Sequence, residues 1–89
     1  MKKINSILKD QSLFFNLIEK ELELSNDVLS KITFLEELEE WDSLAILTFV
    51  TLLDSKFKLN INTEQLNKCK KPTDLYLFVK KNYKKNKKN

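Results

Sequence analysis

The chain has 89 residues, enough for one small domain, and it contains neither glycine nor histidine. Without glycine it cannot form a glycine-rich phosphate loop or a dinucleotide-binding turn. Without histidine it has no histidine-based triad, proton shuttle or histidine-ligated metal, so most enzyme classes become poor candidates.

The acids and lysines, which together give a net charge of +3, are separated along the chain. Ten acids and two lysines lie between residues 19 and 54, whereas residues 56–89 hold eleven lysines and two acids. Such a separation can direct different partners to different parts of a molecule. Residues 84–89 are predicted to form a basic, disordered tail after a single domain at residues 1–83.

Apolar residues recur every three or four positions, and no segment shows the alternation of a convincing β-strand. This pattern predicts an all-α fold, a small four-helix bundle. The start of the first helix has several candidate caps, namely Asn5, Ser6, Asp10 and Ser12. Its end is predicted near the turn-forming residues 24–27.

A long first loop, from about Ser25 to Asp42, exceeds most helix connections in length, so we expect it to pack its own side chains. Leu35 and Leu38 are expected to reach the core from a short helical turn. The second helix, about residues 43–56, is apolar around most of its circumference. It is therefore expected to be largely surrounded by the other helices.

Three polar residues on the second helix, Thr48, Thr51 and Ser55, form a stripe that could face water or a partner. A short third helix is predicted after Asn62, and the fourth helix begins near Pro72, which is tolerated in a first helical turn. The fold class is thus a bundle with a long first loop and a short third helix.

The sequence Asp42-Ser43-Leu44 places a hydroxyl at the start of the second helix. Unpaired N–H groups and the positive end of the helix dipole favour an anion there, so Ser43 could carry a phosphate diester. Aspartate and serine are also ordinary N-caps, and a capping role alone would explain these two residues. The order of the neighbouring motifs favours the first interpretation.

These motifs are Leu35-Glu36-Glu37-Leu38-Glu39-Glu40-Trp41, Asp42-Ser43-Leu44, Ile61, Leu66 and Thr73-Asp74-Leu75. The series, over residues 11–83, resembles the acyl carrier protein family. The resemblance implies that Ser43 carries a covalent 4'-phosphopantetheine whose thiol holds an acyl or aminoacyl group as a thioester. It also implies a first helix that begins near Gln11. Such a carrier is a substrate of enzymes and not an enzyme, and it needs no catalytic residue and no metal.

The resemblance implies three kinds of partner: a phosphopantetheinyl transferase, a ligase that loads an acyl or aminoacyl group, and a downstream transferase or synthase. The residues expected to recognise them are Trp41, Asp42, Leu44, Ala45 and Thr48. Asp42 could also cap the helix, and Leu44 could instead pack in the core. We expect a cytoplasmic monomer without stable membrane insertion, since a carrier visits several active sites.

The chain differs from many fatty-acid carriers at Glu40 and Trp41, where they have Gly-Ala, and it retains only Asp54 of their acidic second helix. The sequence Trp-Asp-Ser-Leu is similar to carriers of amino acids, such as D-alanyl carriers, and to discrete carriers of specialised pathways. A carrier of a dedicated biosynthetic pathway is therefore expected.

Two other functions fit the composition: a small helical nucleic-acid-binding domain, or an adaptor domain without a prosthetic group. The first is suggested by the sequence pI of about 9.0 and by the lysine-rich end. It would need a basic face on a folded helix and would use arginine to read guanine. The lysines concentrate in the tail and arginine is absent, so nucleic acid is not expected as a partner.

Two further groups of residues have simple structural interpretations. Cys69 has no histidine to activate it and is expected to be a buried or half-buried thiol. The four acids between residues 36 and 40 are expected to be a solvated face. They lack the spacing and the turn glycine of a calcium loop, and nothing patterned around them would raise a carboxyl pKa for catalysis.

Overall fold

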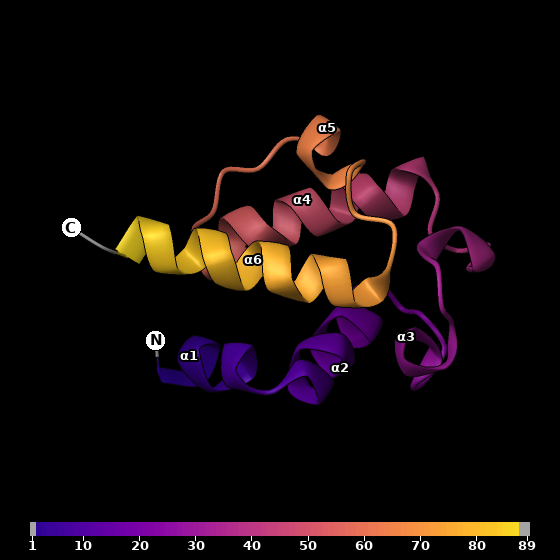
Figure 1. Ribbon diagram of the computed structural model, residues 1–89, viewed down its shortest axis with the longest axis horizontal. Helices are drawn as coiled ribbons and strands as arrows, with labels where there is room; N and C mark the ends of the chain where they lie inside the picture. Colours follow the sequence, from indigo (N-terminus) through magenta and orange to yellow (C-terminus); the bar gives the residue numbers. More distant parts are fainter. Residues whose placement is uncertain (1, 88–89) are drawn as a thin grey trace.

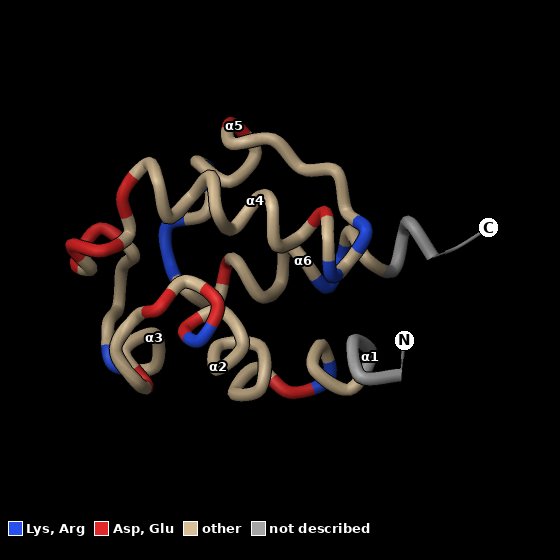
Figure 2. Tube along the Cα trace, turned by 180° about the vertical axis from the view of Figure 1, so that it is seen from behind, with Lys and Arg blue, Asp and Glu red and all other residues tan. Residues whose placement is uncertain are grey.

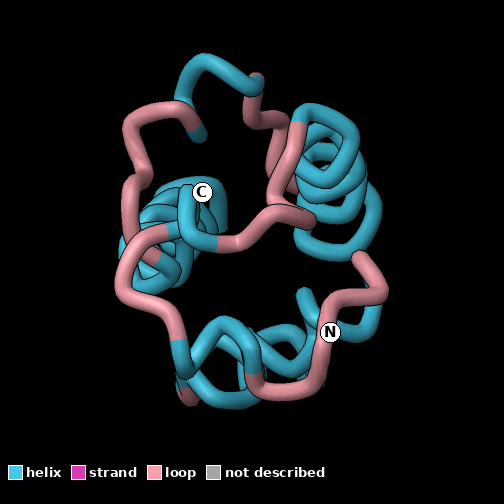
Figure 3. Tube along the Cα trace, turned by 90° about the vertical axis from the view of Figure 1, so that its right-hand side faces the viewer, coloured by secondary structure: helices cyan, strands magenta, loops and turns pink. Residues whose placement is uncertain are grey.

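The structure, a computed structural model, describes residues 2–87 and contains helices and no strand within that range. Figure 1 shows α2, α4 and α6 as the main helices, with α1 beside the C-terminal part of α6. Figure 3 shows that loops join the helices and that no strand is drawn in the described part. The elements are α1 (Lys2–Lys9), α2 (Gln11–Glu21), α3 (Val28–Lys31), the 3-10 helix η1 (Leu35–Glu37), α4 (Ser43–Phe57), α5 (Thr63–Leu66) and α6 (Pro72–Lys87). The predicted all-α fold is confirmed. The four predicted helices correspond to α2, α4, α5 and α6.

The N-terminal helical region consists of two helices that are separated at Asp10. The Asp10 carboxylate accepts a hydrogen bond from the Ser12 N–H (2.9 Å) and caps α2, so the predicted start near Gln11 is confirmed. An earlier helix is also present, as the separate helix α1. The predicted end at residues 24–27 was too late, because α2 ends at Glu21 and Glu23 has a left-handed φ of 56°.

A buried carboxylate organises the turn after α2. Glu19 is only 4% exposed, and its two oxygens accept hydrogen bonds from the N–H groups of Asp27 and Leu29, both at 3.0 Å. Asp27 has a left-handed φ of 61°, a conformation that costs a non-glycine residue about 1–2 kcal/mol. The Glu19 carboxylate therefore holds in place a turn for which the sequence offers no glycine.

The long first loop contains two short helices, α3 and η1, and packs onto the core as predicted. Leu35 and Leu38 are buried, and the Leu35 N–H donates to the carbonyl oxygen of Lys70 (2.8 Å). This hydrogen bond ties the loop to the segment that precedes α6. The loop thus delivers the chain to the start of α4 along a fixed path.

The core joins α2, α4 and α6 through aromatic rings around Phe14. This side chain is fully buried, and its ring centroid lies 6.2 Å from Phe57 and 5.6 Å from Tyr76. Phe49 and Leu53 of α4 are also fully buried. These contacts fix the position of α4 relative to the other long helices.

The expectation that α4 is largely surrounded by other helices was wrong. Leu44 and Leu47 are 70% and 55% exposed. The reason is the small number of elements: the core packs on one side of α4 through Phe49, Leu52 and Leu53. An apolar composition around the whole helix does not indicate which side the rest of the chain will cover.

The C-terminal half follows the predicted pattern except at the end of α6. The short α5 has a capping box of Asn62 and Gln65, and α6 begins at Pro72 as expected. Tyr76 of α6 is buried, and its hydroxyl donates to the Leu8 carbonyl oxygen (2.7 Å). Helix α6 continues to Lys87, past the predicted tail boundary at residue 84, because lysine is a good helix former. Residues 88–89 lie outside the described part.

Replacing Glu19 tests its role in the turn. We expect Glu19→Gln to lower the free energy of unfolding by about 2 kcal/mol, because a hydrogen bond to a charged group contributes roughly 1.5–3 kcal/mol. Urea denaturation followed by circular dichroism measures this change. The control Glu23→Gln alters an exposed acid of the same turn and should change stability by less than about 0.5 kcal/mol. Equal stability of the two variants would contradict the role of Glu19.

Candidate functional site

The candidate site is the start of α4, where Ser43 is the first helical residue and is exposed. Asp42 is the N-cap, and its Oδ1 accepts a hydrogen bond from the Ala45 N–H (2.9 Å). Because Asp42 provides the cap, the Ser43 hydroxyl is not needed for it. Among the described residues, no intrachain hydrogen bond restrains Ser43 Oγ. The hydroxyl is therefore available for modification.

Next to Ser43, four exposed residues of α4, Leu44, Leu47, Thr48 and Thr51, form a surface that we call the α4 outer face. The Thr48 hydroxyl donates to the Leu44 carbonyl oxygen (2.9 Å), and the Thr51 hydroxyl donates to that of Leu47 (3.1 Å). Both hydroxyls are thus satisfied by the helix backbone. The α4 outer face therefore carries no charge and no unsatisfied hydroxyl donor.

The structure brings the predicted recognition residues to one end of α4 but does not expose all of them. Asp42, Leu44 and Thr48 are exposed, so the alternative of core packing for Leu44 was wrong. Trp41 and Ala45 are half-buried, and the Trp41 ring packs edge-on against Phe49 with 5.8 Å between centroids. Trp41 thus fixes the entry into α4 and presents only part of its surface.

Sequence reasoning missed Leu47, which was expected to be buried. Its spacing of three residues from Leu44 places both on one helical face, and this spacing was the available signal. The predicted polar stripe of Thr48, Thr51 and Ser55 is exposed. The stripe borders Leu44 and Leu47, whose exposure the sequence alone did not predict.

A pocket of about 450 Å³ lies beside the candidate site. Trp41 and Ile46, which flank Ser43 in sequence, form part of its wall. The residues that line it are Phe34, Leu35, Glu36, Trp41, Ile46, Leu66, Asn67, Cys69 and Lys70. The pocket therefore lies between the first loop, the first turns of α4 and the α5 region.

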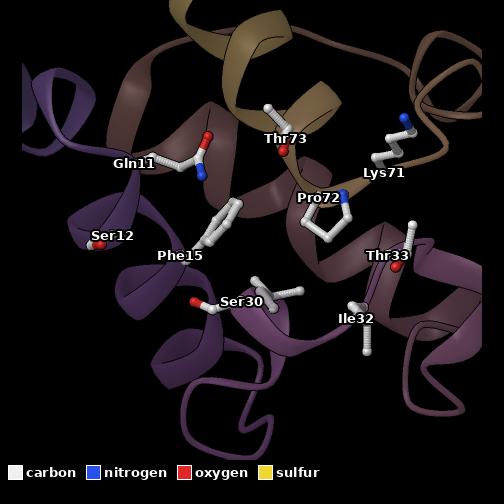
Figure 4. Close-up of a pocket in the computed structure, with 10 residues that line it drawn as sticks. Gln11, Ser12, Phe15, Ser30, Ile32, Thr33, Lys71, Pro72 and Thr73 are labelled. Carbon is white, nitrogen blue, oxygen red and sulfur yellow. The ribbon is translucent and has the colours of Figure 1, made fainter.

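A second pocket, of about 310 Å³, opens between the start of α2, the end of α3 and the start of α6 (Figure 4). Phe15 and Pro72 contribute its apolar wall, and Lys71 is the one charged residue that lines it. Ser43 is not among its lining residues. This pocket is thus separate from the candidate site at the start of α4.

The acids that precede α4 are mainly exposed, as expected for a solvated face. Glu37 also has a structural role, since its Oε2 accepts hydrogen bonds from the N–H groups of Thr33 (3.2 Å) and Phe34 (2.8 Å). Among the described side chains, no group of three or more acids, cysteines or histidines could hold a metal ion.

Cys69 is half-buried, in agreement with the sequence. Burial raises the pKa of its thiol above the ordinary value of 9.0, and the negative charge of Asp74 raises it further. The thiol form is therefore favoured at neutral pH, which makes Cys69 a poor nucleophile.

No protein-family model, curated protein or solved structure matches this chain. Within residues 2–87, no helix combines the length and apolar character needed to cross a lipid bilayer. What the structure defines is a small all-α domain with an exposed serine at the start of its most apolar long helix.

Alkylation tests the environment of Cys69. We expect iodoacetamide at about pH 8 to label Cys69 several-fold more slowly in the folded chain than in urea, because the folded thiol has the higher pKa. As a control, the double variant Cys69→Ser, Asn67→Cys carries its thiol at an exposed position and should react at nearly the unfolded rate.

The same pKa shift predicts a pH dependence of stability. The folded state holds the Cys69 thiol proton more tightly than the unfolded state does. The resulting contribution to the free energy of unfolding is fully present below the unfolded pKa of about 9 and is lost as the pH rises through the folded pKa. Urea denaturation at increasing alkaline pH should show a smaller loss of stability in Cys69→Ser than in the unchanged chain. Equal losses would contradict the shift.

Proposed function

We propose that this chain is a carrier protein of the acyl carrier type, with 4'-phosphopantetheine attached to Ser43. The observation that supports this proposal is the exposed, unrestrained hydroxyl of Ser43, the first residue of α4. Asp42, which precedes it, supplies the helix cap. A serine that served only as a cap would itself accept the hydrogen bond that Asp42 accepts.

In the attachment step, Ser43 Oγ forms a bond to the phosphorus that carries the pantetheine of coenzyme A. The phosphoanhydride bond of coenzyme A breaks, and adenosine 3',5'-bisphosphate leaves. The hydroxyl proton passes to a base of the phosphopantetheinyl transferase, so the carrier needs no base of its own. The difficult chemistry resides in the cofactor and in the partner enzymes.

The start of α4 suits the phosphodiester that this step creates. The first N–H groups of a helix have no helical acceptor, and the 15-residue α4 presents the positive end of its dipole to this position. Asp42 satisfies only one of these donors, through Ala45. A phosphodiester on Ser43 would lie at a terminus that favours its charge.

The α4 outer face is the proposed docking surface for the transferase, the loading ligase and the downstream transferase or synthase. Two exposed leucines beside Ser43 offer apolar area, and the acids between Glu36 and Asp42 form a charged rim at one end. Apolar contacts provide most of the binding free energy at such surfaces, and a charged rim acts mainly on association rates.

The cargo proposed is an acyl or aminoacyl group of a dedicated biosynthetic pathway. The pocket bounded by Trp41 and Ile46 lies next to Ser43, where the phosphopantetheine would be attached. Its wall includes Leu35 and Leu66. We place the carrier in the cytoplasm, which supplies coenzyme A, as a monomer whose outer face remains free for successive enzymes.

Intact mass measurement tests the attachment. After incubation with coenzyme A and a promiscuous phosphopantetheinyl transferase, we expect the chain to gain the mass of one phosphopantetheinyl group. Ser43→Ala should gain none, whereas Ser55→Ala, which removes another exposed hydroxyl of α4, should be modified like the unchanged chain. An unmodified parent chain would refute the carrier proposal.

A matched pair of leucines tests the docking surface. Leu47 and Leu77 are each 55% exposed, but Leu47 lies on the α4 outer face and Leu77 lies on α6. We expect Leu47→Ser to lower kcat/KM of the transferase about tenfold, because contact with one leucine contributes roughly 1–2 kcal/mol. Leu77→Ser should change kcat/KM less than about twofold. Equal effects would place the docking surface elsewhere.

A further inference from the structure

The end of the molecule opposite the α3 side is built from α1, the last turn of α4 and the part of α6 that begins at Leu75 (Figure 1). Two contacts join these elements. The Tyr76 hydroxyl of α6 donates to Leu8 of α1, and the rings of Phe57 and Tyr83 lie 6.3 Å apart, edge to face. We call this region the basic end, because its elements carry most of the lysines.

From Leu75 to Lys87, α6 carries five lysines and no acid. The last turn of α4 holds Lys56, whose ammonium group lies 4.0 Å from the Glu21 carboxylate, and α1 ends at Lys9. Figure 2 shows lysine positions gathered where α4 ends and α6 continues, and many acidic positions around α3 and the loop that precedes α4. The separation of charge in the sequence is therefore also a separation in space.

We propose that the basic end docks on an anionic phospholipid surface, where lysine ammonium groups meet the headgroup phosphates. Clustered lysines are attracted to such surfaces in proportion to their number. Leu77 is 55% exposed, and Lys80 and Lys81 follow it by three and four residues on the same helical face. An exposed leucine beside lysines suits the boundary between headgroups and acyl chains.

The same features disfavour nucleic acid as the partner. The two tyrosines of this end are engaged in packing: Tyr76 is buried below Lys80, and the Tyr83 ring packs against Phe57. Both rings therefore already have an aromatic or cationic neighbour where a base would have to stack. The chain has no arginine, so the bidentate contacts that read guanine are absent.

Docking through the basic end sets the orientation of the molecule. The acids between Glu36 and Asp42 are repelled by an anionic surface, so the end of the folded molecule that contains them faces the solution. Ser43 begins α4 at this acidic end, whereas α4 finishes at the basic end (Figures 1 and 2). The bound orientation therefore leaves Ser43 accessible. The proposal itself does not depend on whether Ser43 is modified.

Vesicle binding of the unmodified full chain tests the proposal. We expect cosedimentation with vesicles of equal parts phosphatidylglycerol and phosphatidylcholine, and none with phosphatidylcholine alone. Replacing Lys81, Lys84, Lys85 and Lys87 with glutamine should weaken the binding by about tenfold or more, because each lysine near the surface contributes to the attraction. Salt of about 0.5 M should weaken it as well.

The control variant replaces Lys20, Lys31, Lys68 and Lys70 with glutamine, all of them exposed and outside the basic end. Both variants lose four positive charges, so net charge alone cannot explain a difference between them. We expect the control to bind within about threefold of the unchanged chain. Circular dichroism confirms that both variants are folded. Equal losses of vesicle binding in the two folded variants would overturn the proposal. Tighter binding to duplex DNA or RNA than to vesicles at equal phosphate concentration would also overturn it.

Trp41, the single tryptophan, reports the orientation because it lies two residues before Ser43. We expect acrylamide to quench its fluorescence equally with and without bound vesicles. Protection of Trp41 by the vesicles would show that the acidic end faces the lipid and would contradict docking through the basic end.

Discussion

The packing of one aromatic side chain, Phe14, is the interaction on which the arrangement of the helices depends. Its ring lies between Phe57 of α4 and Tyr76 of α6, and it is fully buried. In a domain of this size one such cluster accounts for much of the core. Because it fixes α4 against α2 and α6, it also fixes where the first turn of α4 emerges, with Ser43 directed to solvent.

The charge distribution gives the bundle two ends of opposite charge joined by a neutral surface. The acidic end holds the proposed attachment site, and the basic end holds the proposed lipid contact. Between them the α4 outer face, with Leu44 and Leu47, has no charge. A carrier with this layout would rest on a membrane surface and present its arm to enzymes in solution. The net charge of +3 conceals this division.

The sequence was sufficient where local chemistry decides the outcome. The apolar residues of the long loop predicted that Leu35 and Leu38 are buried, and the Asp-Ser pair predicted a helix start at residue 43. It was insufficient where distant segments meet. The Tyr76 hydroxyl bonds to Leu8, 68 residues away, and the buried Glu19 serves a turn eight to ten residues later. The spacing of Leu44 and Leu47 placed both on one helical face, but it did not show that this face is exposed, because an all-apolar helix does not specify which face its neighbours will cover.

The lack of glycine has a consequence for the thermodynamics of folding. Glu23, Asp27 and Lys58 adopt left-handed backbone conformations, where proteins commonly use glycine. Each is strained in the native state, yet each also has fewer accessible conformations in the denatured ensemble than glycine would have. The chain therefore loses less backbone entropy when it folds. A domain with so small a core can tolerate strained turns partly because its denatured state is itself restricted.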